Sequence, residues 1–260
     1  MILVFDVGNT ETTVGLFDGS RLHARWGLTT HETRTDDEVG LMLRALLDSV
    51  DVPCGAVAGV AIGSVVPAMT PTLTAACARC FSLTPLIVDA RSPLPIRLDV
   101  EEPLTVGADR LINTLAASRM YGRDTIVVDL GTATTYDCIT ADGVFLGGII
   151  APGIRTSADT LYRRTSKLPA TELKAPAALI GRRTEECIKS GVIYGAAESI
   201  NGLVRRLKEE WPGSEVPLVV ATGGLAVVLR PHCESFDMVE PELTLHGLRL
   251  AYALLAEPAA

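Results

Sequence analysis

The sequence predicts an α/β protein built from two similar halves, and three observations lead to this class. An apolar run that ends in Asp-x-Gly occurs twice, once at Asp6 and once at Asp129. A turn of small and hydroxylated residues follows each run and leads into a second β-type run. Beyond both hairpins, helical and strand patterns alternate. An internal repeat defines the architecture, so we expect two homologous halves that face one another across a cleft.

The first half is expected to open with three antiparallel strands. Its predicted strands lie at residues 2–7, 13–17, 21–28, 57–66 and 85–89. Residues Thr35–Glu38 have the pattern of a capping box, and apolar residues recur behind them at helical spacing. The strand at 57–66 is almost entirely apolar, as expected for burial on both faces. Pro67 is expected to begin the next helix.

A proline-rich connector, residues 91–103, leads to a predicted helix at 111–120. The second half then repeats the scheme, with three strands within residues 125–150. Its remaining predicted elements are helices at 153–165, 184–210, 225–229 and 244–255 and a strand at 216–221. The helix at 184–210 contains Gly191 and Gly195, near which we expect an interruption. We place the domain boundary at residue 112, which gives domains 1–112 and 113–260.

Composition excludes several classes of protein. The 260 residues carry a net charge of −8 and no basic cluster, which argues against nucleic-acid and anionic-membrane partners. No apolar run reaches the ~18 residues of a spanning helix. The N-terminus begins with a strand rather than a leader pattern, so we expect a cytoplasmic protein. A hydrophobic content of 48% is ample for a large core.

The paired hairpins indicate a phosphate site. An ionised Asp at the end of a buried strand is costly unless something pairs with it, and glycine, threonine and backbone N–H groups suit phosphate oxygens. We assign Asp6 to a magnesium ion through water, and residues 8–13 to the phosphates as N–H and hydroxyl donors. The alternatives are a strand-end acid bonded to its own turn, and simple β-propensity for Thr12 and Thr13. No P-loop is present, since the first lysine is Lys167.

The segment Val106-Gly107-Ala108-Asp109-Arg110 offers a proton acceptor. A carboxylate beside a substrate hydroxyl can take its proton during phosphoryl transfer, and Arg110 can steer the substrate or neutralise phosphate charge. The alternatives are an acid favoured by the helix dipole and a surface ion pair. Thr184, followed by two glutamates, has the alternative of a helix cap.

Together these motifs resemble the type III pantothenate kinases, which belong to the actin-like superfamily. The resemblance covers nearly the whole chain. Its elements are DVGNT at 6–10, GLFD at 15–18, TDDE at 35–38, SVVP at 64–67, VGADR at 106–110, DLGTATTYD at 129–137, GGIIAPG at 147–153, TEECIKSGVIYG at 184–195, TGGLA at 222–226 and LTLHGLRLAYA at 243–253. Each motif is weak alone, whereas their order and spacing are specific.

The resemblance implies two ribonuclease-H-like, actin-like ATPase domains, each a mixed sheet flanked by helices. It implies that ATP with Mg²⁺ phosphorylates pantothenate to 4′-phosphopantothenate, the first step of coenzyme A biosynthesis. Asp109 would accept the proton, and Asp129 would hold a monovalent cation, K⁺ or NH₄⁺. The implied ATP contacts are Asp6, Val7, Gly8, Asn9, Thr10, Glu11, Thr12, Thr13 and Thr132. The implied pantothenate contacts are Gly107, Ala108, Asp109, Arg110 and Thr184. A homodimer would place the substrate at its interface.

Two positions depart from the family pattern. Val100 stands where a tyrosine usually lies near the pantothenate pocket, and Glu11 stands where asparagine is common. Valine in place of tyrosine would change the shape or the affinity of the substrate pocket. The added negative charge of Glu11 beside the phosphates would weaken ATP binding unless it points to solvent. Two further hypotheses therefore stay open: a kinase of another small hydroxylated acceptor, and a non-catalytic nucleotide-binding regulator.

Overall fold

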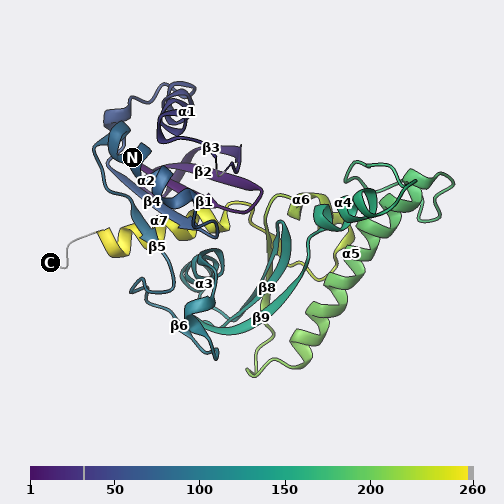
Figure 1. Ribbon diagram of the computed structural model, residues 1–260. Helices are drawn as coiled ribbons and strands as arrows, with labels where there is room; N and C mark the ends of the chain where they lie inside the picture. The colour runs from purple at the N-terminus through teal and green to yellow at the C-terminus, as the bar shows by residue number, and fades with distance from the viewer. Residues whose placement is uncertain (32, 257–260) are drawn as a thin grey trace. The chain divides into compact units, whose positions relative to one another are not determined.

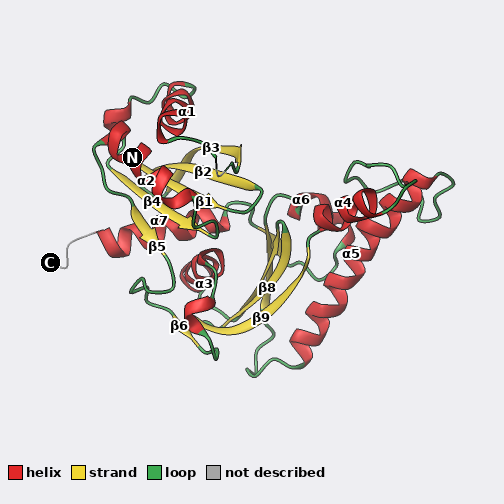
Figure 2. Ribbon diagram, viewed as in Figure 1, coloured by secondary structure: helices red, strands yellow, loops and turns green. Residues whose placement is uncertain are grey.

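The computed structural model describes residues 1–31 and 33–256 and confirms the α/β class (Figures 1 and 2). The chain forms two compact units. The first comprises Met1–Arg119 together with the segment that starts at Leu243, and the second comprises Met120–Glu242. Among the residues described, no helix combines the length and the apolar composition needed to cross a membrane.

The first unit contains a mixed sheet of strand order β3-β2-β1-β4-β5. Its strands are β1 (Ile2–Val7), β2 (Glu11–Asp18), β3 (Arg21–Thr29), β4 (Gly59–Ser64) and β5 (Leu86–Val88). Strand β1 is antiparallel to β2 and parallel to β4. The carboxyl ends of β1 and β4 therefore meet at one edge of the sheet, where ligands bind in open α/β folds.

Helices cover both faces of this sheet. Helices α1 (Asp36–Asp48) and α2 (Met69–Phe81) pack with Leu3, Phe5 and Val7 on one face. Helices α3 (Ala108–Tyr121) and α7 (Leu243–Ala256) pack with Val4 and Ala61 on the other. The alternation of side chains along β1 divides the two cores. The shorter elements are η1 (Cys54–Ala56), β6 (Arg97–Leu98) and η2 (Pro103–Thr105).

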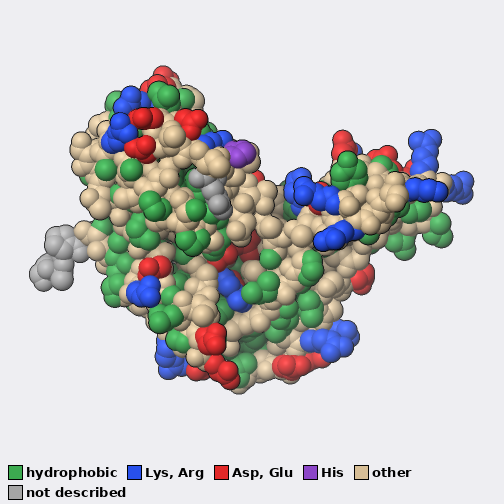
Figure 3. Space-filling view, in the orientation of Figure 1, with side chains coloured by type: hydrophobic (Ala, Val, Ile, Leu, Met, Phe, Trp, Pro, Cys, Tyr) green, Lys and Arg blue, Asp and Glu red, His purple; other side chains and the backbone are tan. Residues whose placement is uncertain are grey.

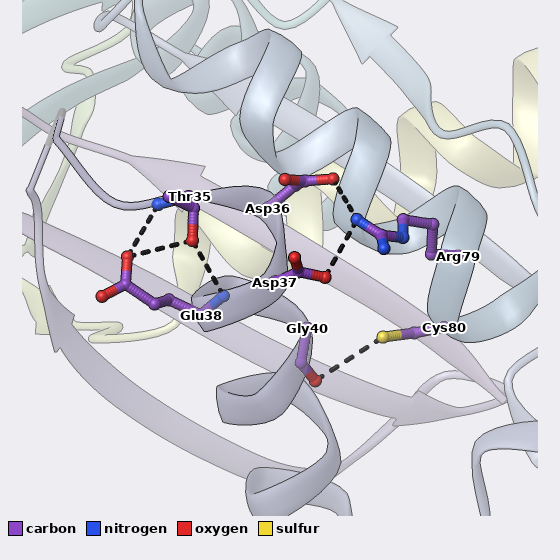
Figure 4. Close-up of polar contacts among 7 residues, drawn as sticks. All are labelled: Thr35, Asp36, Asp37, Glu38, Gly40, Arg79 and Cys80. Carbon is purple, nitrogen blue, oxygen red and sulfur yellow. Dashed lines mark hydrogen bonds and ion pairs between the residues drawn. The ribbon is translucent and has the colours of Figure 1, made fainter.

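The predicted capping box at the start of α1 is confirmed. The Thr35 amide donates to the Glu38 carboxylate at 2.8 Å, and the Glu38 amide donates to the Thr35 hydroxyl at 3.3 Å (Figure 4). Arg79 of α2 pairs with Asp36 at 2.6 Å and Asp37 at 2.9 Å. Basic and acidic side chains also lie next to one another on the surface above α1 (Figure 3). These exposed pairs contribute little, so the cap is the stronger local determinant.

The second unit contains strands ordered β11-β10-β7-β8-β9. Their bounds are β7 (Thr125–Leu130), β8 (Ala133–Ile139), β9 (Val144–Pro152), β10 (Leu218–Thr222) and β11 (Met238–Val239). Helices α4 (Ile154–Arg164), α5 (Thr184–Glu209) and α6 (Ala226–Leu229), with η3 (Arg230–His232), complete the unit. Ile126, Val128 and Leu130 pack with α5 on one face of the sheet, as β1 packs with α1 and α2.

Two features differ from the sequence-based expectations. Helix α5 runs for 26 residues without a break, so the predicted interruption near Gly191 and Gly195 is wrong. A Cβ at either glycine would meet no neighbour within 4 Å, and the buried face of α5 holds the helix together. The last helix, α7, packs on β1 and β4, so the compact units follow a different division from residues 1–112 and 113–260. The boundary between repeated halves stays a prediction.

Candidate active site

The first hairpin turn is closed by one backbone hydrogen bond. The Gly8 amide donates to the Glu11 carbonyl oxygen at 3.0 Å. A Cβ on residue 8 would lie 2.9 Å from that same oxygen, closer than side chains approach. Glycine at this position therefore allows the turn between Val7 and Thr12 to close tightly.

Asp6 and Thr13 lie directly opposite one another on β1 and β2. Both are half-buried and project to the face that carries α3 and α7. Thr12 projects to the other face, where it is 3% exposed and its hydroxyl lies 2.9 Å from that of Thr30. Residues 8–13 were expected to supply N–H and hydroxyl donors to phosphates; for Thr12 the hydroxyl faces the core, because strand alternation turns it inwards, and only its backbone lies at the turn.

The start of α3 lies at the same edge of the sheet as Asp6. Gly63 of β4 is the register partner of Asp6. A Cβ on Gly63 would lie 2.4 Å from Cδ1 of Ile112, so α3 packs directly against this strand. Directly before α3, a Cβ on Gly107 would lie 3.5 Å from Cγ1 of Val65. The residues Gly107–Arg110 are therefore brought to the end of the strand pair that carries Asp6.

Asp109 lies in the first turn of α3. The Arg110 amide donates to its Oδ1 at 2.9 Å. Burial raises the pKa of Asp109, while the Arg110 amide and the Arg110 charge act in the opposite direction. A carboxylate with a raised pKa in a partly desolvated position is suited to accept a proton. Arg110 is itself half-buried.

The second hairpin repeats the first with a shorter turn. Asp129 lies opposite Thr135 on β7 and β8, as Asp6 lies opposite Thr13. The Gly131 amide donates to the Ala133 carbonyl oxygen at 3.0 Å. Thr134 is 4% exposed and faces the core, like Thr12. The predicted duplication therefore extends to which threonine is buried and which lies beside the acid.

The loop after β10 lies against Asp129. Thr222 is the register partner of Asp129. A Cβ on Gly223, whose φ is +86°, would lie 2.5 Å from the Asp129 Oδ1. The Thr222 hydroxyl is buried and has no hydrogen-bond partner among the residues described. The carboxylate thus lies next to the Gly223 backbone and to a buried hydroxyl that has no hydrogen-bond partner among the residues described.

The remaining predicted residues lie outside the strand ends described above. Val100 lies half-buried between β6 and η2. Thr184 is exposed and is the first residue of α5, whose N-cap is Arg183, so the capping alternative for Thr184 is wrong. Thr132 lies in the second turn, and its carbonyl oxygen accepts from the Gly153 amide at 3.2 Å.

The donor set fits a water-bridged divalent ion. Within residues 1–31 and 33–256, no group of three or more His, Cys, Asp or Glu side chains could hold a metal ion. Mg²⁺ in phosphoryl-transfer sites is typically bound by one or two carboxylates, waters and the substrate phosphates rather than by a protein cage. Asp6 supplies one half-buried carboxylate beside the turn that the Gly8 amide closes, and this donor type is the one that such an ion uses.

Three residues with structural roles at the hairpins were not singled out from the sequence. Thr30 contacts the first turn, and Gly153 and Thr156 contact the second. A Cβ on Gly153 would lie 2.3 Å from the Thr132 carbonyl oxygen. Each follows the third strand of its half, but this position gives no signal until the strands are folded back onto the turn.

Comparison with known proteins gives a consistent result. The sequence profile described as type III pantothenate kinase matches residues 2–206. The type III pantothenate kinase of Thermomicrobium roseum is 45% identical over 97% of this chain and 96% of its own length. That of Roseiflexus sp. is 44% identical over 98% and 99%. The structure of a putative 2-dehydro-3-deoxygalactonokinase from Sinorhizobium meliloti covers 100% of this chain and 98% of its own, with a TM-score of 0.58 and 14% identity. It shows the shared actin-like, sugar-kinase fold.

Proposed function

Because this chain belongs to the type III pantothenate kinase family, we propose that it transfers the γ-phosphoryl group of ATP to the hydroxyl of pantothenate. The product, 4′-phosphopantothenate, enters coenzyme A biosynthesis. The observation that carries this proposal is the position of Asp109, which is half-buried at the start of α3 and at the sheet edge near Asp6, the next-to-last residue of β1. A proton acceptor and a phosphate turn at one edge are the two parts that the reaction needs.

The first hairpin turn is proposed to bind the phosphates of ATP. The tight closure at Gly8 brings several backbone groups into one short turn, and such concavities attract anions. The proposed contacts are Asp6, Val7, Gly8, Asn9, Thr10, Glu11, Thr12 and Thr13 from the first hairpin and Thr132 from the second. Thr12 contributes through its backbone, since its side chain is buried. Asp6 would hold Mg²⁺ through water, and the ion would neutralise charge on the phosphates.

Asp109 is proposed to accept the proton of the attacking alcohol. The alcohol oxygen forms a bond to the γ-phosphorus, and the bond between that phosphorus and the bridging oxygen of ADP breaks. The proton passes from the alcohol to Asp109. Because burial raises the pKa of this carboxyl, its ionised form is a better base than an exposed aspartate. Gly107, Ala108 and Arg110 would position the acceptor around it.

Asp129 is proposed to hold a monovalent cation, K⁺ or NH₄⁺. Gly223 allows backbone to approach this carboxylate, and the buried Thr222 hydroxyl is adjacent in register. Carboxylate, hydroxyl and backbone oxygens are suitable ligands for a monovalent cation. Such a cation would screen phosphate charge, which the net charge of −8 makes more important.

The acceptor pocket is proposed to include Val100 and Thr184, with catalysis in a homodimer. The support is the family membership and the half-buried position of Val100. A small apolar side chain at residue 100 removes a ring and a hydroxyl from the pocket. A different hydroxylated acceptor is therefore the second candidate, and a non-catalytic nucleotide-binding regulator is the third.

One assay separates the three candidates. ADP formation is followed by a coupled assay with pantothenate, with other small hydroxylated acids and without an acceptor, each in potassium and in sodium buffer. The proposal expects ADP only with pantothenate, together with a product whose mass has increased by one phosphoryl group. Turnover with another acceptor alone supports the second candidate. Nucleotide binding without turnover in all mixtures supports the third.

A further inference from the structure

Carbonyl oxygens in both hairpin turns accept hydrogen bonds from residues that follow the third strand of the same half. In the first half the residue is Thr30, directly after β3. In the second half the residues are Gly153, directly after β9, and Thr156, in the first turn of α4. We propose that Thr30 and Thr156 are positioning residues that orient the two turns for nucleotide phosphates. This inference rests on the function proposed above.

Thr30 contacts the first turn at two points. Its hydroxyl donates to the Gly8 carbonyl oxygen at 2.7 Å, and its amide donates to the Thr10 carbonyl oxygen at 3.0 Å. The hydroxyls of Thr12 and Thr30 are 2.9 Å apart. Since the single proton of the Thr30 hydroxyl goes to Gly8, Thr12 is the donor to Thr30. The buried side of the turn is therefore a continuous chain of hydrogen bonds.

This series of hydrogen bonds sets the direction of the backbone N–H groups in the first turn. A peptide group is planar and trans, so the C=O of one residue and the N–H of the next point in opposite directions. With the Gly8 and Thr10 carbonyls directed at Thr30, the amides of Asn9 and Glu11 point away from it. Those two amides belong to the proposed phosphate turn. Thr30 thus acts on the site without touching the ligand.

The second turn has an equivalent arrangement. The Thr156 hydroxyl donates to the Thr132 carbonyl oxygen at 2.6 Å, and the Gly153 amide donates to the same oxygen at 3.2 Å. The Ala133 amide, which shares that peptide plane, points away from α4. The same solution in both halves, built from different elements, indicates that fixed turn carbonyls are a requirement of the site rather than an accident of one loop.

The test replaces hydroxyls while it keeps side-chain shape. Thr30→Val and Thr156→Val remove the donors, and Thr30→Ser and Thr156→Ser restore them. Thr74→Val is the matched control, because the Thr74 hydroxyl donates to the Thr70 carbonyl oxygen at 2.8 Å within α2 rather than to a turn carbonyl. The KM for ATP, the KM for pantothenate and kcat are measured for each variant. Amide exchange of residues 8–13 and 131–135 is measured by mass spectrometry without ligand.

Loss of one net hydrogen bond of about 1 kcal/mol predicts a rise of about fivefold in the KM for ATP. Both valine variants should show this rise and faster exchange in their own turn, with the KM for pantothenate unchanged. The serine variants and Thr74→Val should resemble the parent protein. An unchanged KM for ATP with unchanged exchange overturns the inference, as does an equal rise in both KM values. A parent protein without turnover contradicts the proposed function instead, and the exchange data then decide the positioning role alone.

Discussion

The Gly223 Cα lies so close to Asp129 that an added Cβ would be 2.5 Å from its Oδ1. Gly223 also has φ of +86°, a conformation that L side chains rarely adopt. Two independent constraints therefore require glycine at this position. The positive φ constrains the backbone of the loop after β10. The short distance to Oδ1 constrains the position of the Asp129 carboxylate.

Gly223→Ala should lower the free energy of unfolding by about 1–3 kcal/mol, because the residue must adopt a strained conformation or shift the loop. Gly224→Ala is the control for stability, since a Cβ there would meet nothing within 4 Å. Urea unfolding of the three proteins measures the difference. Equal midpoints for both variants would show that the loop adapts without cost.

Asp129 should make activity depend on the monovalent cation. We expect the parent enzyme to be activated by K⁺ over Na⁺ and Asp129→Asn to lose this difference, because the amide carries no charge to hold the ion. Initial rates in potassium, ammonium and sodium buffers at constant ionic strength provide the measurement. Equal rates of the parent enzyme in all three buffers would contradict the proposal that Asp129 holds a monovalent cation.

Asp109→Asn should lower kcat by about 10²–10⁴-fold and leave nucleotide binding intact, because the amide cannot accept the proton. Calorimetric titration with ATP serves as the binding measurement. A variant with nearly full turnover would exclude Asp109 as the base. Protonation of Asp109 should abolish its role as a base, so kcat of the parent enzyme should fall at low pH. Because the pKa of Asp109 is raised, this fall should begin at a higher pH than it would with an exposed aspartate as the base.

The same substitution should stabilise the fold at neutral pH. Burial raises the folded-state pKa of Asp109 above its unfolded value, so ionisation at higher pH destabilises the folded state. Asp109→Asn removes that charge, and its Tm should exceed that of the parent at pH 7. The difference should shrink as the pH falls through the folded-state pKa and should be lost below the unfolded value of about 3.9, where the carboxyl is protonated in both states. A constant difference in Tm across this range would contradict the assignment.

Gly107→Ala should impair catalysis through the position of the base. A Cβ on residue 107 would lie 2.5 Å from the Asp109 Oδ1 and must displace it. We expect a fall in kcat of about tenfold or more, since small misplacement of a reacting group is costly, with the KM for ATP unchanged. Gly55→Ala is the control in the same unit, as its Cβ would meet nothing within 4 Å. Equal kcat values for the two variants would show that a Cβ at residue 107 does not impair the function of the Asp109 carboxylate.

The sequence predicted most strands, most helices and the duplication, because apolar periodicity and the repeated Asp-x-Gly pattern are local signals. The α1 cap was also predictable, since Thr35 and Glu38 have a fixed spacing. The unbroken α5 was not, because a packed helix face outweighs the low propensity of two glycines. The return of α7 to the first sheet depends on contacts between distant segments, and Ile112 against Gly63 gives no pattern in the sequence.

Candidate site residues can be proposed from sequence motifs, whereas the contacts that support them cannot. Asp6 and Asp109 stand in recognisable motifs, and the structure brings their elements to one sheet edge. Thr12 shows the limit: its residue type suggested a ligand donor, but strand alternation buries it against Thr30. Thr30 and Thr156 follow strands at positions that any polar residue could occupy, so only the folded turn reveals them.

The two turns differ in length, with residues 8–11 between the paired Val7 and Thr12 and residues 131–133 between the paired Leu130 and Thr134. The second turn therefore has one peptide group fewer with which to form a concavity of N–H groups. Two turns that share a register but differ in length cannot present the same pattern of backbone donors, so duplication of the hairpin does not make the two turns chemically equivalent.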